Sequence, residues 1–448
     1  MTRLIALLAA STIAFFAICA DALAVPFRGS VHWSVLLCKY TDSGVPPQSA
    51  DFYRDMFLRL GSGGLADYWQ SISMGSINFA GSVVKGWYTV PMTVAQAKAK
   101  SGGSNPHRKE LVEDCIAAAR KATTEAHQVP PGGRVVAITF PEVDMFGETG
   151  RVLLSHTVEL GAMAHEVGHG LGLKHSYSDD PNYRNAEWSS PGEYDDEWDV
   201  MSWAHVFKVR TDRFGRSAPG LNAYYRDYMG WLPRSRMVTF GADGVISSSV
   251  TLAALGQSDV TGPYLVRVPF DLSDRFHYYT IEYRRKNAWD AGIPSDLVLL
   301  HEIVRHSDGR YYATLLRERS GRRSPLKELH ANGVTISVVS LDGNHATVKI
   351  DSGFAKREPR NPARLVSGPN TCKAGYVWRE ADESDWVCVS MPTRTQVQND
   401  NARATSGPCE AGLVSREAFP GDRVCVTAAV RAQTIKDNMN ASNRVIER

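Results

Sequence analysis

One eleven-residue pattern constrains this chain more than any other part of its sequence. The run from His165 to His175 has the form H-E-x-x-H-x-x-G-x-x-H. On a helix, His165 and His169 project from one face about one turn apart, where both imidazoles can reach a single metal ion. Gly172 lacks a Cβ and can adopt the positive φ that ends a helix, so that His175 approaches from another direction. The pattern therefore predicts a three-histidine metal site.

The same pattern predicts what such a site does. Three protein ligands leave one coordination position open, which is typical of catalytic zinc, whereas structural zinc sites fill all four positions with protein. Zinc lowers the pKa of a water molecule to roughly 7 and polarises a carbonyl. Glu166 is placed to act as the general base on that water rather than as a ligand. The alternative is a helix with unrelated surface histidines, which five fixed positions in eleven disfavour.

A methionine follows the histidine pattern in the run Val200-Met201-Ser202, and Gly230-Trp231-Leu232 comes later. Together with the histidines, these residues resemble the metzincin clan of zinc endopeptidases, and within it the gametolysin and immune-inhibitor-A types. The resemblance implies an α+β catalytic domain with a mixed sheet and a zinc helix. It also implies that Met201 forms a packed turn beneath the metal, although core packing alone would explain a lone methionine. No tyrosine occupies the two positions after Met201, so the extra tyrosine ligand of some clan members is not expected.

Residues 1–24 combine a basic start, an apolar run and a small-residue ending, Ala22-Leu23-Ala24. This arrangement predicts a secretory signal peptide, with an uncleaved membrane anchor as the alternative. No later stretch has the 18 or more apolar residues that a membrane helix needs, so we expect a secreted chain without a membrane span. The formal net charge of +2 gives no electrostatic case for binding nucleic acid.

Of the seven cysteines, Cys19 lies in the predicted signal peptide, and an even number in an exported chain favours disulfides. An internal repeat places Cys372 and Cys388 at the same offset of 37 residues from Cys409 and Cys425. Units this small cannot bury enough apolar area to be stable without a covalent cross-link, so we predict the disulfides Cys372–Cys388 and Cys409–Cys425.

The two remaining cysteines are Cys38, on a predicted strand at 31–40, and Cys115, on the apolar stripe of a predicted helix at 107–127. They could face each other, but geometry decides whether they pair. We reject Cys38 as an inhibitory metal ligand because it lies within a strand of the expected catalytic sheet.

The length of 448 residues predicts more than one domain. We expect a catalytic domain at 25–235, a β-sandwich at 236–352, a linker at 353–370 and two cysteine-containing repeats at 371–448. Further helices are expected at 50–60, 65–71 and 221–228, and further strands at 134–140 and 152–155. The last of these is the expected edge strand along which clan enzymes bind substrate. Strands of the sandwich are expected at 264–270, 278–283, 297–304, 311–316, 334–341 and 346–350, with His301 and Glu302 as structural residues.

An acidic segment lies between His175 and Met201. Its hard oxygen ligands could hold calcium, and the alternative is a solvated loop. Its members are Asp179, Asp180, Glu193, Asp195, Asp196, Glu197 and Asp199.

The leading hypothesis is a secreted zinc-dependent endopeptidase that acts on a protein or peptide substrate. The alternative is an adhesin or matrix-binding protein on a catalytically silent protease scaffold. Scaffolds of that kind usually lose the base or a ligand, and here Glu166 and the three histidines are all present. The repeats, which carry no catalytic pattern, are expected to bind a surface or matrix ligand.

Overall fold

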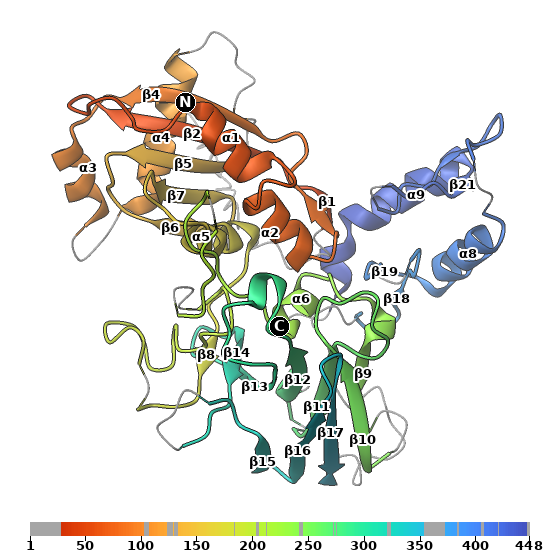
Figure 1. Ribbon diagram of the computed structural model, residues 1–448. Helices are drawn as coiled ribbons and strands as arrows, with labels where there is room; N and C mark the ends of the chain where they lie inside the picture. The colour runs from red at the N-terminus through yellow and green to blue at the C-terminus, as the bar shows by residue number, and fades with distance from the viewer. Residues whose placement is uncertain are drawn as a thin grey trace, which may run out of the picture.

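The computed structural model is a mixed α and β structure (Figure 1). It describes residues 28–102, 107–122, 129, 133–182, 184–202, 206–211, 213–241, 245–271, 273–274, 276–319, 324–353, 372–382, 385–404, 407–419 and 421–445. The predicted signal peptide and residues 354–370 of the predicted linker lie outside these residues. In the described parts of the chain, no helix has both the length and the hydrophobicity that a membrane crossing requires.

A five-stranded sheet forms the first part of the chain, with the strand order β4-β2-β5-β7-β6. Its strands are β2 (Trp33–Tyr40), β4 (Val83–Val90), β5 (Arg134–Phe140), β6 (Phe146–Glu148) and β7 (Arg151–Ser155). All neighbours are parallel except β6 and β7. A short parallel pair, β1 (Gly29–Ser30) and β3 (Ile77–Asn78), lies beside it.

Helices cover both faces of this sheet because its strands carry apolar side chains on both faces. On β2, Val35 and Leu37 pack on one face, while Leu36 and Cys38 pack on the other. The first face is covered by α1 (Ala50–Leu58), α2 (Leu65–Ile72) and α5 (Leu160–Leu171), and the second by α3 (Val94–Ser101) and α4 (Arg108–Ala122). The predicted helices and strands of this region are confirmed, although residues 123–127 of the predicted helix at 107–127 lie outside the described residues.

The edge of this sheet differs from the prediction. We expected 152–155 to be the edge strand, but β6 pairs antiparallel with β7 and covers it. Gly150, with φ 76°, allows the chain to fold back between the two strands. The edge strand is therefore β6: the strand predicted at 152–155 is confirmed as β7, but the prediction that it lies at the edge was wrong.

Two further sheets form a β-rich region below the first sheet in Figure 1. The six-stranded sheet has the order β8-β14-β13-β12-β11-β9, and the four-stranded sheet has the order β10-β17-β16-β15. A hydrophobic core receives Val266 and Ile281 from the first of these sheets and Ile336 and Val348 from the second. The strands are β8 (Tyr177–Ser178), β9 (Met237–Thr239), β10 (Ser247–Ala253), β11 (Leu265–Pro269), β12 (Tyr278–Arg284), β13 (Leu297–Arg305), β14 (Tyr311–Leu315), β15 (Glu328–Ala331), β16 (Val334–Leu341) and β17 (His345–Ser352).

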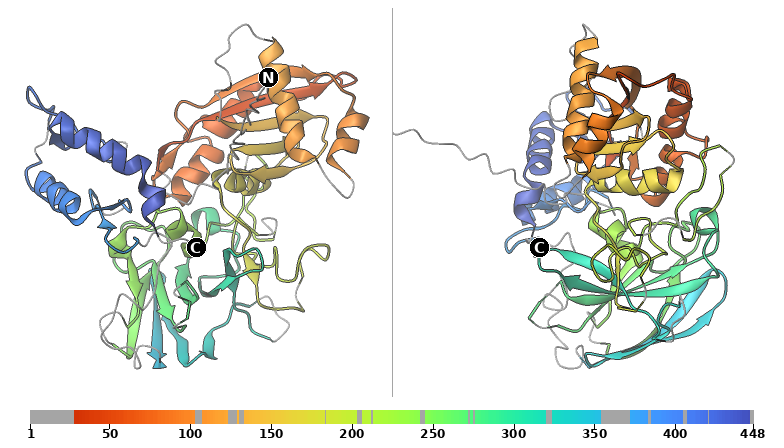
Figure 2. Two further views of the ribbon diagram at one scale, coloured as in Figure 1. Left: turned by 180° about the vertical axis from the view of Figure 1, so that it is seen from behind. Right: turned by 90° about the vertical axis from the view of Figure 1, so that its left-hand side faces the viewer.

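Strand β8 connects the two parts of the structure. It comes directly after the histidine pattern, yet it pairs with β14 in the six-stranded sheet. Helix α6 (Ala223–Tyr228) lies where the two parts meet (Figure 1), and Figure 2 shows these two parts from two further directions. The boundary at 235 stays a prediction, because the chain before it contributes a strand to the sheet after it.

The two C-terminal repeats have the same internal structure. Each has a short hairpin, closed by a disulfide, and a following helix. The elements are β18 (Val377–Trp378), β19 (Cys388–Val389), α8 (Met391–Ala402), β20 (Val414–Ser415), β21 (Cys425–Val426) and α9 (Ala428–Met439). Three short 3₁₀ helices complete the described elements, at Arg234–Arg236, Ala288–Asp290 and Ala441–Arg444.

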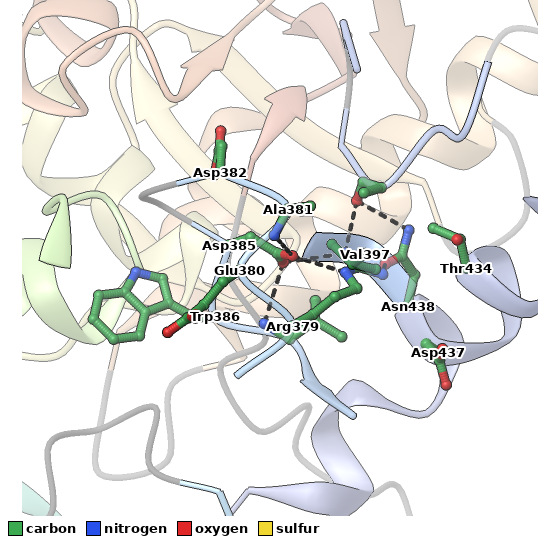
Figure 3. A network of polar contacts seen from close by, with 12 residues as sticks. Arg379, Glu380, Ala381, Asp382, Asp385, Trp386, Val397, Thr434, Asp437 and Asn438 are labelled. Atoms are coloured by element: carbon green, nitrogen blue, oxygen red, sulfur yellow. Dashed lines mark hydrogen bonds and ion pairs between the residues drawn. The ribbon is translucent and has the colours of Figure 1, made fainter. Parts of the chain in front are cut away.

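A network of polar contacts around two buried arginines joins the repeats, and Figure 3 shows the surroundings of the first of them, Arg379. Arg379 of the first repeat donates to Asp385 within its own repeat at 2.7 Å and to Asn438, on the helix of the second repeat, at 2.8 Å. Arg416 of the second repeat donates to Asn401 of the first at 2.8 Å. Because each guanidinium bonds to the helix of the other repeat, the two repeats form one unit.

This unit also contacts the rest of the chain. Arg234 donates to the backbone carbonyls of Asp382 and Asp385, both at 2.7 Å. Its guanidinium lies 5.4 Å from the ring centroid of Trp386 and 5.9 Å from that of Trp378. One arginine thus makes two hydrogen bonds and two cation–π contacts with the first repeat.

Candidate metal centre

Helix α5 carries two of the predicted metal ligands and is packed closely on several sides. Its glycines permit this approach, because a Cβ on Gly168 would overlap the sulfur of Met201, and a Cβ on Gly170 would lie 2.6 Å from the ring of Trp33. The helix is therefore held against both the sheet and the segment around Met201.

The turn that ends α5 also orients a histidine. Gly172 has φ 104°, and the next N–H, that of Leu173, donates to the carbonyl of Gly168 at 3.0 Å. This is the Schellman arrangement that glycine favours. The carbonyl of Leu173 then accepts a hydrogen bond from Nδ1 of His169 at 2.9 Å.

The three histidines of the pattern meet at one point. Nε2 of His169 lies 3.1 Å from Nε2 of His165 and 2.9 Å from Nε2 of His175. Each Nδ1 has its own acceptor: the Val200 carbonyl lies 2.8 Å from that of His165, and Oε1 of Glu193 lies 2.6 Å from that of His175. Within the described residues, these histidines form the one group of three or more His, Cys, Asp and Glu side chains that could hold a metal ion.

The protonation of the rings indicates that this donor set fits a metal. A backbone carbonyl can only accept, so the Nδ1 atoms of His165 and His169 carry protons, and in neutral rings their Nε2 atoms are bare lone pairs. Burial, followed by repulsion from His165 and His175, lowers the pKa of His169 and keeps that ring neutral. Lone pairs that face one another at about 3 Å repel unless a cation lies between them. Imidazole nitrogens in this number suit zinc.

Glu166 lies in the same cleft, which has a volume of about 690 Å³. Burial raises the pKa of Glu166 to about 8; nearby Arg108 lowers it, and Asp144 raises it further. A cation bound at the three imidazoles would favour the carboxylate form again. Other residues that line the cleft are Glu142, Val143, Met145, Phe146, Gly147, Ala162, Lys174, Tyr177, Trp188, Glu193, Tyr194, Ser202 and Tyr312.

Met201 lies beneath α5 and is fully buried. Its N–H donates to Asp199 at 2.6 Å, and its carbonyl accepts from the N–H of Ser176 at 3.0 Å. The methionine thus supports the helix and closes the segment that leads away from His175.

Three residues around His175 were not assigned to the histidine site from the sequence, although Glu193 was among the candidate calcium ligands. Glu193 accepts from the Nδ1 of His175, and Tyr225 donates from its hydroxyl to the carbonyl of His175 at 2.7 Å. The ring centroid of Tyr194 lies 4.1 Å from that of His175, and Tyr194 has φ 65°. One signal pointed to such residues: a metal-ligating imidazole needs a hydrogen-bond acceptor at its second ring nitrogen.

The carboxylates of the acidic segment bond mainly to other groups of the protein. The pairs are Asp179 with Arg319, Asp180 with the N–H of Asn182, Asp195 with the N–H of Asn185, Asp196 with His301, Glu197 with Arg317, and Asp199 with the N–H groups of Met201 and Asn222. Within the described residues, none of these carboxylates belongs to a group of three or more that could hold a metal ion, so calcium binding stays a prediction. His301 lies on β13 and does not belong to the three-histidine group, as predicted.

The six cysteines after Cys19 form three disulfides. Cys38 pairs with Cys115, with a Cα–Cα distance of 6.0 Å, and the two predicted repeat disulfides are confirmed. Cys38 packs on the face of the sheet opposite α5 and is bonded to α4, so it cannot reach the histidines.

No known family model matches the chain, and no curated protein matches its sequence significantly.

Proposed function

We propose that this chain is a secreted zinc-dependent endopeptidase of the metzincin type, similar to the gametolysin and immune-inhibitor-A peptidases. The observation that carries the proposal is the convergence of three Nε2 atoms, on His165, His169 and His175, in the cleft that also contains Glu166. Three disulfides support export, because disulfides persist in oxidising compartments.

The residues divide the chemistry among them. Zinc held by the imidazoles would supply an acidified water and polarise the scissile carbonyl. Glu166 would take a proton from that water as general base and then donate it to the leaving amine. The acceptors at the three Nδ1 atoms keep the rings in the tautomer that a metal needs.

The edge strand β6 is the proposed place for the substrate backbone, which would add as a further strand. Gly147 at its centre allows β6 to lie close against α5, since a Cβ there would lie 2.7 Å from Cβ of His169. A peptide paired with β6 would therefore run beside the histidines and Glu166.

We further propose that residues 25–235 form a metzincin-type catalytic domain and that residues 236–352 form a β-sandwich. The joined repeats would attach the enzyme to a surface or matrix ligand, and their described residues contain no group of His, Cys, Asp or Glu side chains that could hold a metal ion.

Zinc-loaded protein incubated with a diverse peptide library, with cleavage sites read by mass spectrometry, tests the proposal. We expect cleavage by the wild type and none by Glu166→Gln at matched zinc content. Zinc-loaded, folded wild type that cleaves no peptide would instead favour the adhesin on a silent scaffold.

A further inference from the structure

Arg317, directly after β14, is the buried cation at the centre of a long-range contact. Its side chain is fully buried, and its Nε donates to the hydroxyl of Ser178 at 2.8 Å. Its terminal nitrogen contacts the carboxylate of Glu197 and the carbonyl of Asp195. These partners are 120 to 139 residues away in the sequence and lie on the segment between His175 and Met201.

A second contact comes from the neighbouring strand β13. Nε2 of His301 lies 3.0 Å from a carboxylate oxygen of Asp196, and both side chains are buried. Burial alone would lower the pKa of His301, but the bond to Asp196 and its charge raise it. The N–H of Asp196 donates to the hydroxyl of Ser202 at 2.9 Å, which closes the turn that carries Val200 and Met201.

These two contacts hold the segment that carries the hydrogen-bond acceptors of two histidines. Arg317 holds Asp195 and Glu197, and the chain just before them carries Glu193, the acceptor for His175. His301 holds the turn whose Val200 carbonyl is the acceptor for His165. A shift at either contact would therefore move an acceptor of a metal-ligating imidazole.

We propose that Arg317 and His301 are positioning residues for the three-histidine site, so that the β-rich region sets the metal affinity of a site carried by the chain before it. The proposal rests on the metal-binding part of the proposed function and is independent of the reaction catalysed there. Direct hydrogen-bond partners of metal ligands typically contribute about 10- to 100-fold in metal affinity, and Arg317 and His301 hold the segment that carries two such partners, Glu193 and the Val200 carbonyl.

The chain offers a matched control two residues after Arg317. Arg319 donates to Asp179, on the same acidic segment, at 2.9 Å, but its side chain is 58% exposed. An exposed ion pair contributes little to stability. If burial and geometry give Arg317 its role, then loss of the Arg319 pair should leave the metal site unchanged.

The experiment compares full-length Arg317→Lys, His301→Gln and Arg319→Met with the wild type. Lysine keeps a positive charge beside Glu197, so the variant avoids an unpaired buried carboxylate, but it lacks the planar fork that reaches Ser178 and Asp195 at once. Thermal unfolding fixes a temperature at which every variant is folded. Zinc affinity is then measured there by competition with a chromogenic chelator, and the Co²⁺-substituted proteins are compared by their visible absorption.

We expect Arg317→Lys and His301→Gln to bind zinc about 10-fold more weakly or worse and to show altered Co²⁺ absorption bands. Arg319→Met should match the wild type. Folded Arg317→Lys and His301→Gln with wild-type zinc affinity and wild-type Co²⁺ spectra would overturn the proposal, even if both unfold at lower temperature. The zinc-affinity and Co²⁺ measurements need no substrate. A wild type that binds zinc but cleaves no peptide would therefore refute the proposed peptidase without changing the conclusion about Arg317 and His301.

Discussion

The contact between Glu193 and His175 gives the sharpest quantitative prediction for the metal site. Oε1 of Glu193 lies 2.6 Å from Nδ1 of His175, and both side chains are less than one-fifth exposed. The bond from His175 is the largest cause that lowers the pKa of Glu193, so the carboxylate is charged at neutral pH. A charged acceptor strengthens the bond and increases the electron density at Nε2.

Glu193→Ala removes both the acceptor and the charge. We expect the zinc dissociation constant to rise about 10- to 100-fold, which weakens binding by about 1.4 to 2.8 kcal/mol at roughly 1.4 kcal/mol per factor of ten. Glu193→Gln keeps an oxygen acceptor without the charge, so its loss should fall at the lower end of this range.

Chelator competition on folded protein measures these constants. Glu187→Ala is the matched control, because Glu187 is an exposed carboxylate on the same segment. Wild-type zinc affinity in Glu193→Ala would show that this acceptor does not prepare His175 for the metal.

Three further predictions concern different parts of the molecule. Glu166→Ala should keep its zinc and lose about 10²- to 10⁴-fold in peptide hydrolysis; an empty site in the folded variant would reassign Glu166 as a ligand or support. The bond to Glu302, opposed by burial and aided by Asp271, raises the pKa of His277. Its contribution to stability is therefore complete below about pH 6.5 and is lost as pH rises through the raised pKa. The gap in unfolding temperature between wild type and His277→Gln should accordingly narrow from pH 5 to pH 9, and a constant gap would contradict this. Arg234→Ala should release the two repeats from the rest of the chain. Small-angle scattering should then show a larger radius of gyration, with unchanged zinc content. An unchanged radius would show that other contacts are enough to hold the repeats in place.

The elements of the first sheet and of the helices that cover it could be predicted because their signals are local. The spacing of His165 and His169, the glycine at 172 and the apolar runs at 31–40 and 134–140 each depend on neighbours in sequence. The paired cysteines of the repeats were predictable for a similar reason, since the 37-residue offset defines each closed loop.

The contacts that complete the site could not be predicted because they join distant residues. β6 has three residues, too few to show a strand period, so the edge of the sheet was assigned to its neighbour. The partners of Glu197 and Asp196 could not be predicted, because Arg317 and His301 lie more than 100 residues away in the sequence. Glu193 was grouped with these carboxylates, although its partner is a histidine.

Metal replacement on the full-length protein tests the central claim most directly. Zinc per chain is measured by mass spectrometry before chelation, after chelation and after zinc is returned, with peptide cleavage followed in each state. We predict one zinc per chain, loss of cleavage with loss of the metal, and recovery of both together. Cleavage that continues in verified metal-free protein would contradict the account.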